Sequence, residues 1–178
     1  IKISNAYQEL LSLAEKCQIP VINTLLGLSS FPANHYLYYG WPGMHGMAYS
    51  NLILDQADLI IAVGMRFDDR ITGNPEKFAV SAKKIHIDID PAEIGKIIQV
   101  DVPIVSDAKT ALKELITNVK DKEHSEWLTQ IDRIKNNHPS LKLRDTQKLI
   151  PQYIIKKLHE ITEGKAIIVT GVGQHQMW

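Results

Sequence analysis

The sequence predicts an α/β fold in which a parallel sheet carries helices on both faces. Four short segments rich in apolar and β-branched residues have the length of strands, at 19–24, 58–64, 84–90 and 102–106. Segments with the period of amphipathic helices lie between them. Because right-handed crossovers align the carboxyl ends of parallel strands, we expect the polar residues that follow these strands to meet at one edge.

Composition limits the class of protein. The chain has 178 residues, of which 44% are hydrophobic and 22% charged, as is typical of a soluble globular protein. Its formal net charge is zero, so we expect neither nucleic acid nor a membrane as partner. Cys17 is the only cysteine, which excludes an internal disulfide framework and fits a reducing compartment. The sequence starts at Ile1 without a methionine, from which we expect a piece of a longer chain.

The first predicted helix covers residues 5–16, where apolar residues recur at helical spacing. Asn5 and Gln8 have the spacing of a capping box at its start. The strand that follows ends at Thr24. Thr24 and Leu25 should therefore lie level with the ligand-binding edge of the sheet.

Residues 26–44 form a long stretch rich in Gly, Pro, Ser and aromatic residues, which predicts a functional or mobile loop. The loop ends in the motif GMHG at 43–46, where glycines would let the backbone approach a ligand closely. The alternatives are that His45 caps a helix or lies in the core and that Met44 only packs. A helix is expected over roughly 46–56.

The stretch ADLIIAVGMRFDDRITG at 57–73 is the centre of the predicted site. A buried strand runs directly into Arg66 and Arg70, whose planar guanidinium groups suit phosphates or carboxylates. Asp68 and Asp69 can accept from hydroxyl groups or hold the arginines. The alternative is a solvated loop with surface ion pairs, in which Asp69 caps the next turn.

A short helix is expected at 75–80, followed by the alternating strand KIHIDID at 84–90. The alternation predicts two faces, with Ile85, Ile87 and Ile89 on one and His86, Asp88 and Asp90 on the other. Carboxylates at the end of such a strand can hold a ribose in dinucleotide-binding folds, although the G-x-G-x-x-G motif is missing here.

The last predicted strand of the first domain is followed by Asp107, which is placed to cap the next helix. The composition changes at about residue 120, and residues 120–148 are highly charged. They contain one amphipathic helix, marked by Trp127, Ile131 and Ile134. We interpret this part as an interdomain connection that packs on the first domain.

A second domain is expected to begin near Pro151, which suits the first turn of a helix. The buried face of this helix is predicted at Ile154, Ile155, Leu158 and Ile161, and Gly164 should end it. A buried strand at 166–170 should follow. Its turn at 171–173 could direct backbone N–H groups at an anion, with Gln174 and His175 as further donors.

Four motifs in this order resemble the acetolactate synthase (acetohydroxyacid synthase) large catalytic subunit. They are GMHG at 43–46, RFDDR-x-TG at 66–73, HIDID at 86–90 and TGVGQHQMW at 170–178. The resemblance implies a central FAD-binding domain with a Rossmann-like parallel sheet at 1–120, an interdomain linker at 121–149 and the truncated start of a thiamine-diphosphate-binding domain at 150–178.

The resemblance also implies an activity. The family condenses two pyruvates, or pyruvate with 2-oxobutyrate, to acetohydroxy acids with release of CO₂, in the synthesis of isoleucine, valine and leucine. Its cofactors are FAD, thiamine diphosphate and Mg²⁺. The catalytic glutamate and the metal-binding motif of the family have no counterpart in this chain, so it should contain neither catalytic nor metal-binding residues and be inactive by itself.

Carried over by position, the resemblance assigns three groups of site residues. The FAD contacts are Thr24, Leu25, Met44, His45, Arg66, Arg70, Asp88, Ile89 and Asp107. Asp69 and Arg70 lie at the mouth of the substrate channel. Val172, Gly173, Gln174 and His175 hold the diphosphate of thiamine diphosphate.

The expected partners are small 2-keto acids, a second copy in a homodimer or higher oligomer, and a regulatory small subunit. The expected location is the cytoplasm, or the plastid in a photosynthetic source. One alternative is a related thiamine-dependent flavoenzyme such as pyruvate oxidase, in which the flavin is redox-active. The other is a nucleotide-binding module without a reaction of its own.

Overall fold

The computed structural model describes residues 1–140, 142–143 and 148–177 and divides the chain into two compact units. Unit 1 is Ile1–His138 and unit 2 is Pro139–Trp178. The predicted connection at 121–149 and the motif that ends at Trp178 therefore extend in part over residues outside those described.

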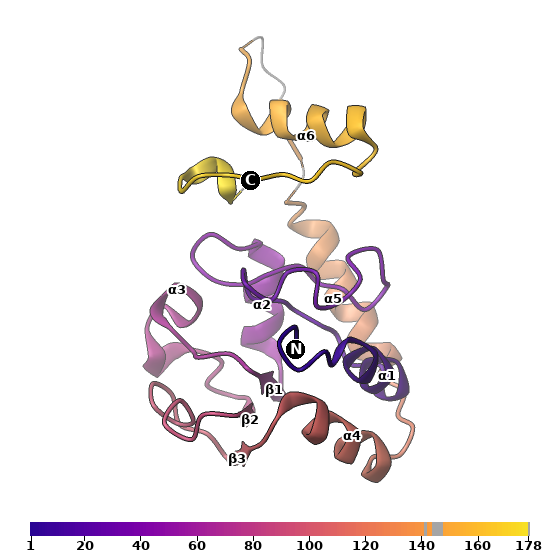
Figure 1. Ribbon diagram of the computed structural model, residues 1–178, viewed down its shortest axis with the longest axis vertical. Coiled ribbons are helices and arrows are strands. Elements are labelled where there is room, and N and C mark those ends of the chain that lie inside the picture. Colours follow the sequence, from indigo (N-terminus) through magenta and orange to yellow (C-terminus); the bar gives the residue numbers. More distant parts are fainter. Residues whose placement is uncertain (141, 144–147, 178) are drawn as a thin grey trace. The chain divides into compact units, whose positions relative to one another are not determined.

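A parallel sheet forms the centre of unit 1 (Figure 1). Its three strands in the described residues are β1 (Leu59–Val63), β2 (Lys83–Asp88) and β3 (Val102–Val105), in that order across the sheet. In β1, Val63 packs against a cluster that includes Leu13 and Leu112, which come from helices on one side of the sheet. Ile60 packs on the opposite side, against Leu54 of another helix. The predicted parallel α/β fold is confirmed.

The helices of unit 1 pair with one another around this sheet. Helix α1 packs against α4, and α2 packs against α5. Their bounds are α1 Tyr7–Cys17, α2 Ala48–Gln56, α4 Ala108–Asn118 and α5 Ser125–Asn137, with the short α3 at Asp69–Thr72 and a 3₁₀ turn, η1, at Pro75–Lys77. The helix predicted at 46–56 is thus confirmed, and the one at 75–80 is a single 3₁₀ turn.

Helix α4 begins as the sequence predicts. Asp107 is its N-cap, and Oδ1 of Asp107 accepts from the backbone N–H groups of Lys109 and Thr110. These bonds satisfy two of the N–H groups that have no partner at the start of a helix. Leu112 on the same helix is completely buried against α1, which anchors the end of β3 to the core.

The capping box predicted at the start of α1 is wrong. The N-cap is Ala6, no side chain caps the helix, and Asn5 has a φ of +49°. The backbone N–H of Asn5 donates to Lys2 O and that of Ala6 donates to Ile1 O. Because a backbone turn precedes the helix, Asn5 is not in the extended conformation that a capping residue requires.

The strand predicted at 19–24 does not join the sheet. Val21 forms an isolated parallel bridge with Tyr38, donates to Leu37 O and accepts from the N–H of Tyr39. Leu37 and Tyr39 come from the long loop at 26–44 and are almost completely buried. The loop therefore supplies the pairing partner that we had expected from the sheet, because burying these two side chains brings its backbone alongside Val21.

Both faces of the strand predicted at 84–90 are covered where it forms β2. Lys84 and His86 are buried, whereas Ile89 is 71% exposed and lies beyond the end of β2. Strand β2 is the central strand and is covered on both sides, as is usual in parallel sheets. Nζ of Lys84 donates to the carbonyls of Ala79 and Ala82, so its charge is solvated by backbone oxygens.

Helix α5 belongs to the core of unit 1. Ile131 is completely buried and packs with Tyr39, Tyr49 and the α2 residue Ile53. The hydroxyl of Tyr39 donates to Asp132 Oδ1 at 2.8 Å. Burial, together with this hydrogen bond and the charge of Asp132, raises the pKa of Tyr39 far above its ordinary value, so the hydroxyl remains a donor. Helix α5, at Ser125–Asn137, thus packs on the sheet domain.

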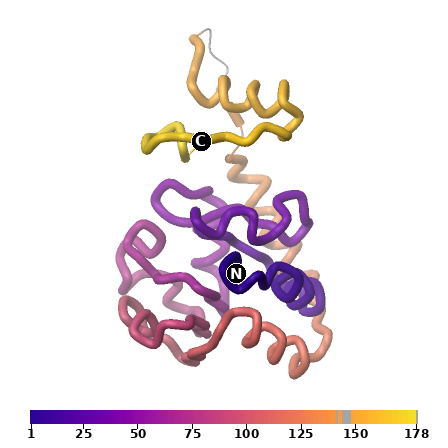
Figure 2. Tube along the Cα trace, viewed as in Figure 1, coloured from indigo at the N-terminus to yellow at the C-terminus, as the bar shows by residue number. Residues whose placement is uncertain are grey.

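Unit 2 contains helix α6 (Pro151–Thr162) and the 3₁₀ turn η2 (Gln174–Gln176), joined by an extended segment that Figure 2 traces. Pro151 occupies the first turn, as predicted. On the predicted buried face of α6, Ile154, Leu158 and Ile161 are exposed and Ile155 is half-buried. No strand forms at 166–170, where Ile167 is 94% exposed. An apolar face is buried only against another element, and the described residues of unit 2 supply none that covers it.

Among the described residues, no helix combines the length and hydropathy needed to cross a membrane.

Candidate functional site

The carboxyl ends of the three strands form a continuous edge. The N–H of Gly64, just after β1, donates to Ile87 O at 2.8 Å, and the N–H of Ser106, just after β3, donates to Asp88 O at 3.0 Å. Three segments that are separate in the sequence are therefore joined by backbone hydrogen bonds. In open α/β sheets ligands bind at such an edge.

Two predicted acidic residues lie at this edge. Asp88 is half-buried, and its Oδ1 accepts from the N–H of Asp90 at 3.0 Å. Hydrogen bonds from the Ser4 side chain and from the N–H groups at the start of α4 lower the pKa of Asp107. Burial lowers the pKa of the Ile1 amino group, and the charges of Asp107 and Asp88 oppose that shift. Both carboxylates thus act on the same small region.

The turn after β1 carries the two predicted arginines. Arg66 Nη2 lies 3.4 Å from Asp68 Oδ2, and Arg70 Nη1 lies 2.5 Å from Asp69 Oδ1. Both arginine side chains are 72% exposed. Asp68, not Asp69, caps α3 by accepting from the N–H of Arg70. Among the residues that the structure describes, the two arginine side chains therefore pair only with carboxylates of their own turn, and both are largely exposed to solvent.

The GMHG segment meets this turn directly. The backbone N–H of Met44 donates to Arg70 O at 2.7 Å. Gly43 has a φ of +102°, and a Cβ built on it would lie 2.2 Å from Arg70 O. Only glycine fits here, because both the conformation and the available space exclude a side chain. Met44 and His45 are both exposed.

The remaining predicted FAD contacts, Thr24, Leu25 and Ile89, have fewer connections to the arginine turn. The N–H of Asn23 donates to Gly40 O, so Thr24 and Leu25 follow a segment tied to the loop before Gly43. The described residues show no hydrogen bond or ion pair between either of them and the Arg66–Arg70 turn. Ile89 is exposed next to Asp88.

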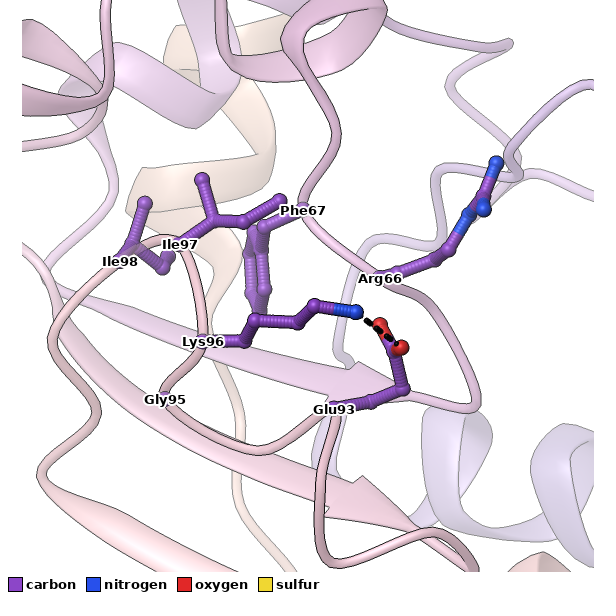
Figure 3. A pocket seen from close by; sticks show the side chains of 7 residues that line it. All are labelled: Arg66, Phe67, Glu93, Gly95, Lys96, Ile97 and Ile98. Atoms are coloured by element: carbon purple, nitrogen blue, oxygen red, sulfur yellow. Dashed lines mark hydrogen bonds and ion pairs between the residues drawn. The ribbon is translucent and has the colours of Figure 1, made fainter.

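A small hollow lies beside Arg66 (Figure 3). Its lining residues are Arg66, Phe67, Glu93, Gly95, Lys96, Ile97 and Ile98. Nζ of Lys96 lies 2.7 Å from Glu93 Oε1, and the Arg66 side chain extends away from this ion pair. The hollow encloses essentially no space, so it is far below the usual size of a small-molecule pocket.

Two residues that support the site were missed by the sequence analysis. His86 is completely buried, its Nε2 lies 2.8 Å from Met65 O, and its ring packs edge-on against Phe67. Asn51, in α2, forms two hydrogen bonds with Gly43. Alternation placed His86 on the face opposite the isoleucines without showing that this face is covered, and nothing in the sequence pairs Asn51 with Gly43.

The predicted diphosphate-binding residues lie in unit 2. Val172 is almost fully exposed. Gly173 precedes η2 in an extended conformation, and the N–H of Gln176 donates to its carbonyl. The ring of His175 folds back over Gly173, where a built Cβ would lie 2.7 Å from the ring. These residues therefore form one compact turn.

Comparison with known proteins identifies the family. Residues 1–115, which contain the whole sheet and its carboxyl edge, match the family described as "Thiamine pyrophosphate enzyme, central domain". Since this match covers more than half of the chain, the chain belongs to the thiamine pyrophosphate enzymes.

Individual relatives are more specific. The chain is 46% identical over 168 residues to the acetolactate synthase large subunit of Lactococcus lactis subsp. lactis (strain IL1403), an alignment that covers 94% of this chain and 29% of that protein. It is 44% identical over 180 residues to acetolactate synthase of Mycobacterium leprae (strain TN), covering 97% of the chain and 29% of that protein. It is 46% identical over 177 residues to acetolactate synthase 1, chloroplastic, of Zea mays, covering 96% of this chain and 28% of that protein.

The similarity to acetolactate synthases that the motifs predicted is therefore confirmed. The chain spans 28–29% of the length of these relatives.

Proposed function

We propose that the chain is the central segment of an acetolactate synthase large subunit. The whole protein would condense two pyruvates, or pyruvate with 2-oxobutyrate, to acetohydroxy acids with release of CO₂, in branched-chain amino-acid synthesis. The observation that carries the proposal is the 44–46% identity to acetolactate synthases over 94–97% of the chain. The segment by itself would be inactive.

We propose that unit 1 binds FAD along the carboxyl edge of its sheet. Open space supports this fit at Gly64, where a built Cβ meets no atom closer than 4.0 Å. Ligand backbone or phosphate could approach the chain there without a clash. The chemistry of the donors also fits, because two exposed guanidinium groups and two strand-end carboxylates lie along one edge.

Each group of residues has a defined part in this proposal. Arg66 and Arg70 would bind the FAD diphosphate, since guanidinium groups pair with phosphate oxygens through two N–H donors. Asp88 would accept from ribose hydroxyls, with Asp107 at the adjacent strand end. The other FAD contacts would be Thr24, Leu25, Met44, His45 and Ile89.

The reaction itself would depend on thiamine diphosphate, which supplies the electron sink for decarboxylation, and on Mg²⁺. In unit 2, Val172, Gly173, Gln174 and His175 would hold the diphosphate of that cofactor. Asp69 and Arg70 would line the mouth of the substrate channel, where the cation of Arg70 attracts the carboxylate of a 2-keto acid. FAD would have no net redox role.

We further propose the organisation of the whole protein. Residues 1–120 would be the FAD-binding domain, 121–149 the interdomain linker and 150–178 the start of the thiamine-diphosphate-binding domain. The protein would act as a homodimer or higher oligomer with a regulatory small subunit. It would function in the cytoplasm, or in a plastid if the source is photosynthetic, as the name of the Zea mays relative indicates for that protein.

The decisive experiment measures products of the full-length protein that carries this chain. With pyruvate, thiamine diphosphate, Mg²⁺ and FAD we expect acetolactate and CO₂, with the flavin oxidised after turnover. Acetate or acetyl phosphate together with reduced flavin would instead identify a pyruvate-oxidase type of enzyme. FAD binding without any product would leave a nucleotide-binding module and overturn the proposal.

A further inference from the structure

The side-chain amide of Asn51 bonds both backbone polar groups of one residue of the GMHG segment, Gly43. The backbone N–H of Gly43 donates to Asn51 Oδ1 at 2.7 Å, and Asn51 Nδ2 donates to Gly43 O at 3.1 Å. Asn51 lies on α2, whose residues Tyr49 and Ile53 are buried in the core. A paired hydrogen bond fixes orientation as well as distance, so a rigid helix sets the position of Gly43.

Gly43 also lies in close contact with the turn that carries the arginines. Gly43 would collide with Arg70 O if it carried a Cβ, and the next N–H, that of Met44, donates to that carbonyl. A small displacement of Gly43 would therefore break the bond between Met44 and Arg70. The connection from α2 to the arginine turn thus consists of a pair of hydrogen bonds between Asn51 and Gly43, followed by one from Met44 to Arg70.

We propose that Asn51 is a positioning residue for the FAD site. It holds the GMHG segment against the Arg70 carbonyl. The backbone that carries Met44 and His45 therefore keeps a fixed position relative to the charged turn at 66–70. This inference rests on the proposed function. Both polar atoms of the Asn51 side chain, Oδ1 and Nδ2, bond the backbone of Gly43, which supports a positioning role.

Two measurements on the full-length protein test this role. The variants are Asn51→Leu, which keeps the volume and removes both hydrogen bonds, and Asn51→Gln, which restores the amide. The matched control is Asn118→Leu, because Asn118 is also an exposed helical asparagine and donates to Glu114 O far from this turn in sequence. Thermal unfolding without FAD checks that each variant is folded.

The first measurement is hydrogen exchange of the Met44 amide in the protein without FAD. We expect exchange about tenfold faster in Asn51→Leu, partial recovery in Asn51→Gln and no change in Asn118→Leu. Unchanged exchange in Asn51→Leu would overturn the role of Asn51 in holding this segment. This result does not depend on any cofactor.

The second measurement is FAD affinity by fluorescence quenching, with the visible circular dichroism of the bound flavin. We expect Asn51→Leu to weaken binding about tenfold and to alter the flavin spectrum, and Asn51→Gln to recover both in part. Faster exchange with unchanged FAD affinity would overturn the positioning role. Failure of the unaltered protein to bind FAD would instead overturn the proposed function.

Discussion

At the scale of single residues, the important feature of the candidate site is that its two arginines can change partners. Arg66 and Arg70 pair with carboxylates in their own turn, and both side chains are largely exposed. Ion pairs of this kind contribute little to stability because water screens them. An arginine can therefore leave its carboxylate for a ligand phosphate at small cost, which a buried pair could not do.

This availability predicts the effect of Arg66→Ala in the full-length protein. We expect the dissociation constant of FAD to rise about 10- to 100-fold, because a phosphate loses a charged hydrogen-bond donor. Fluorescence quenching of FAD measures it. The control is Arg133→Ala, at an exposed position of α5, which should leave the constant unchanged. Equal FAD affinity in the Arg66 variant and the unaltered protein would contradict the assignment.

Gly43 makes a second prediction at this scale. Gly43→Ala should lower the free energy of unfolding by about 2–4 kcal/mol, because it adds a clash with Arg70 O to the strain of a positive φ. Gly73→Ala is the matched control, since Gly73 has a φ of +59° and no atom within 4 Å of a built Cβ. It should cost only about 1 kcal/mol. Similar losses in urea titrations of the two variants would show that crowding at Gly43 is unimportant.

At the scale of elements, helix α5 shows how a charged segment becomes part of a core. Most of its surface is polar, but Ile131 is completely buried and Tyr39 binds Asp132. Nζ of Lys135 also lies 5.0 Å from the centre of the Tyr39 ring. A narrow apolar stripe, supported by the hydrogen bond of Asp132 and the cation–π contact of Lys135, is enough to pack the helix on α2.

The docking of α5 predicts a large effect of Ile131→Ala. We expect the free energy of unfolding to fall by about 2–4 kcal/mol, because the buried side chain leaves a cavity among Tyr39, Tyr49 and Ile53. Ile161→Ala, at an exposed position of α6, should change it by less than about 0.5 kcal/mol. Urea unfolding followed by circular dichroism compares the two. A loss below 1 kcal/mol for Ile131→Ala would mean that α5 docks only loosely.

At the scale of the whole molecule, the buried apolar residues are all in unit 1, from Ala6 to Ile131 among the described residues. Unit 2 leaves the apolar residues of α6 and of 167–172 exposed. Stability should therefore come from unit 1 alone, since apolar side chains contribute only when they are removed from water.

Shortening the chain tests where the stable part ends. A chain that ends at His138 should keep the cooperative unfolding transition of the 178-residue chain. A chain that ends at Lys120 should lose more than about 3 kcal/mol, because it lacks Ile131 and the rest of α5. Urea unfolding of the three chains compares them directly. Equal stability of the two shortened chains would assign α5 to the linker alone.

Several features were predictable because they depend on near neighbours in the chain. The strands β1 and β3, the helices α2 and α4 and the cap at Asp107 all follow from local periodicity and from one side chain close to a helix start. The meeting of strand ends at one edge also followed, since parallel strands with right-handed crossovers leave little choice.

Other features depended on remote partners. Residues 19–24 have the composition of a sheet strand, yet Val21 pairs with Tyr38 because the loop buries Leu37 and Tyr39 beside it. His86 is completely buried, and alternation alone does not show that its face of the strand is covered. The link from Asn51 through Gly43 to Arg70 joins three segments, and no spacing rule connects an amide on one helix to a carbonyl in a distant turn.

The amino-acid sequence by itself determined the class of fold, the order of its elements and the membership of the thiamine pyrophosphate enzymes, because these reside in short motifs and in the period of apolar residues. Only the tertiary structure decided which faces are buried and how the GMHG segment meets the arginine turn. The reason is that burial and backbone pairing depend on which distant segment packs on a given surface, and a local stretch of sequence does not contain that information.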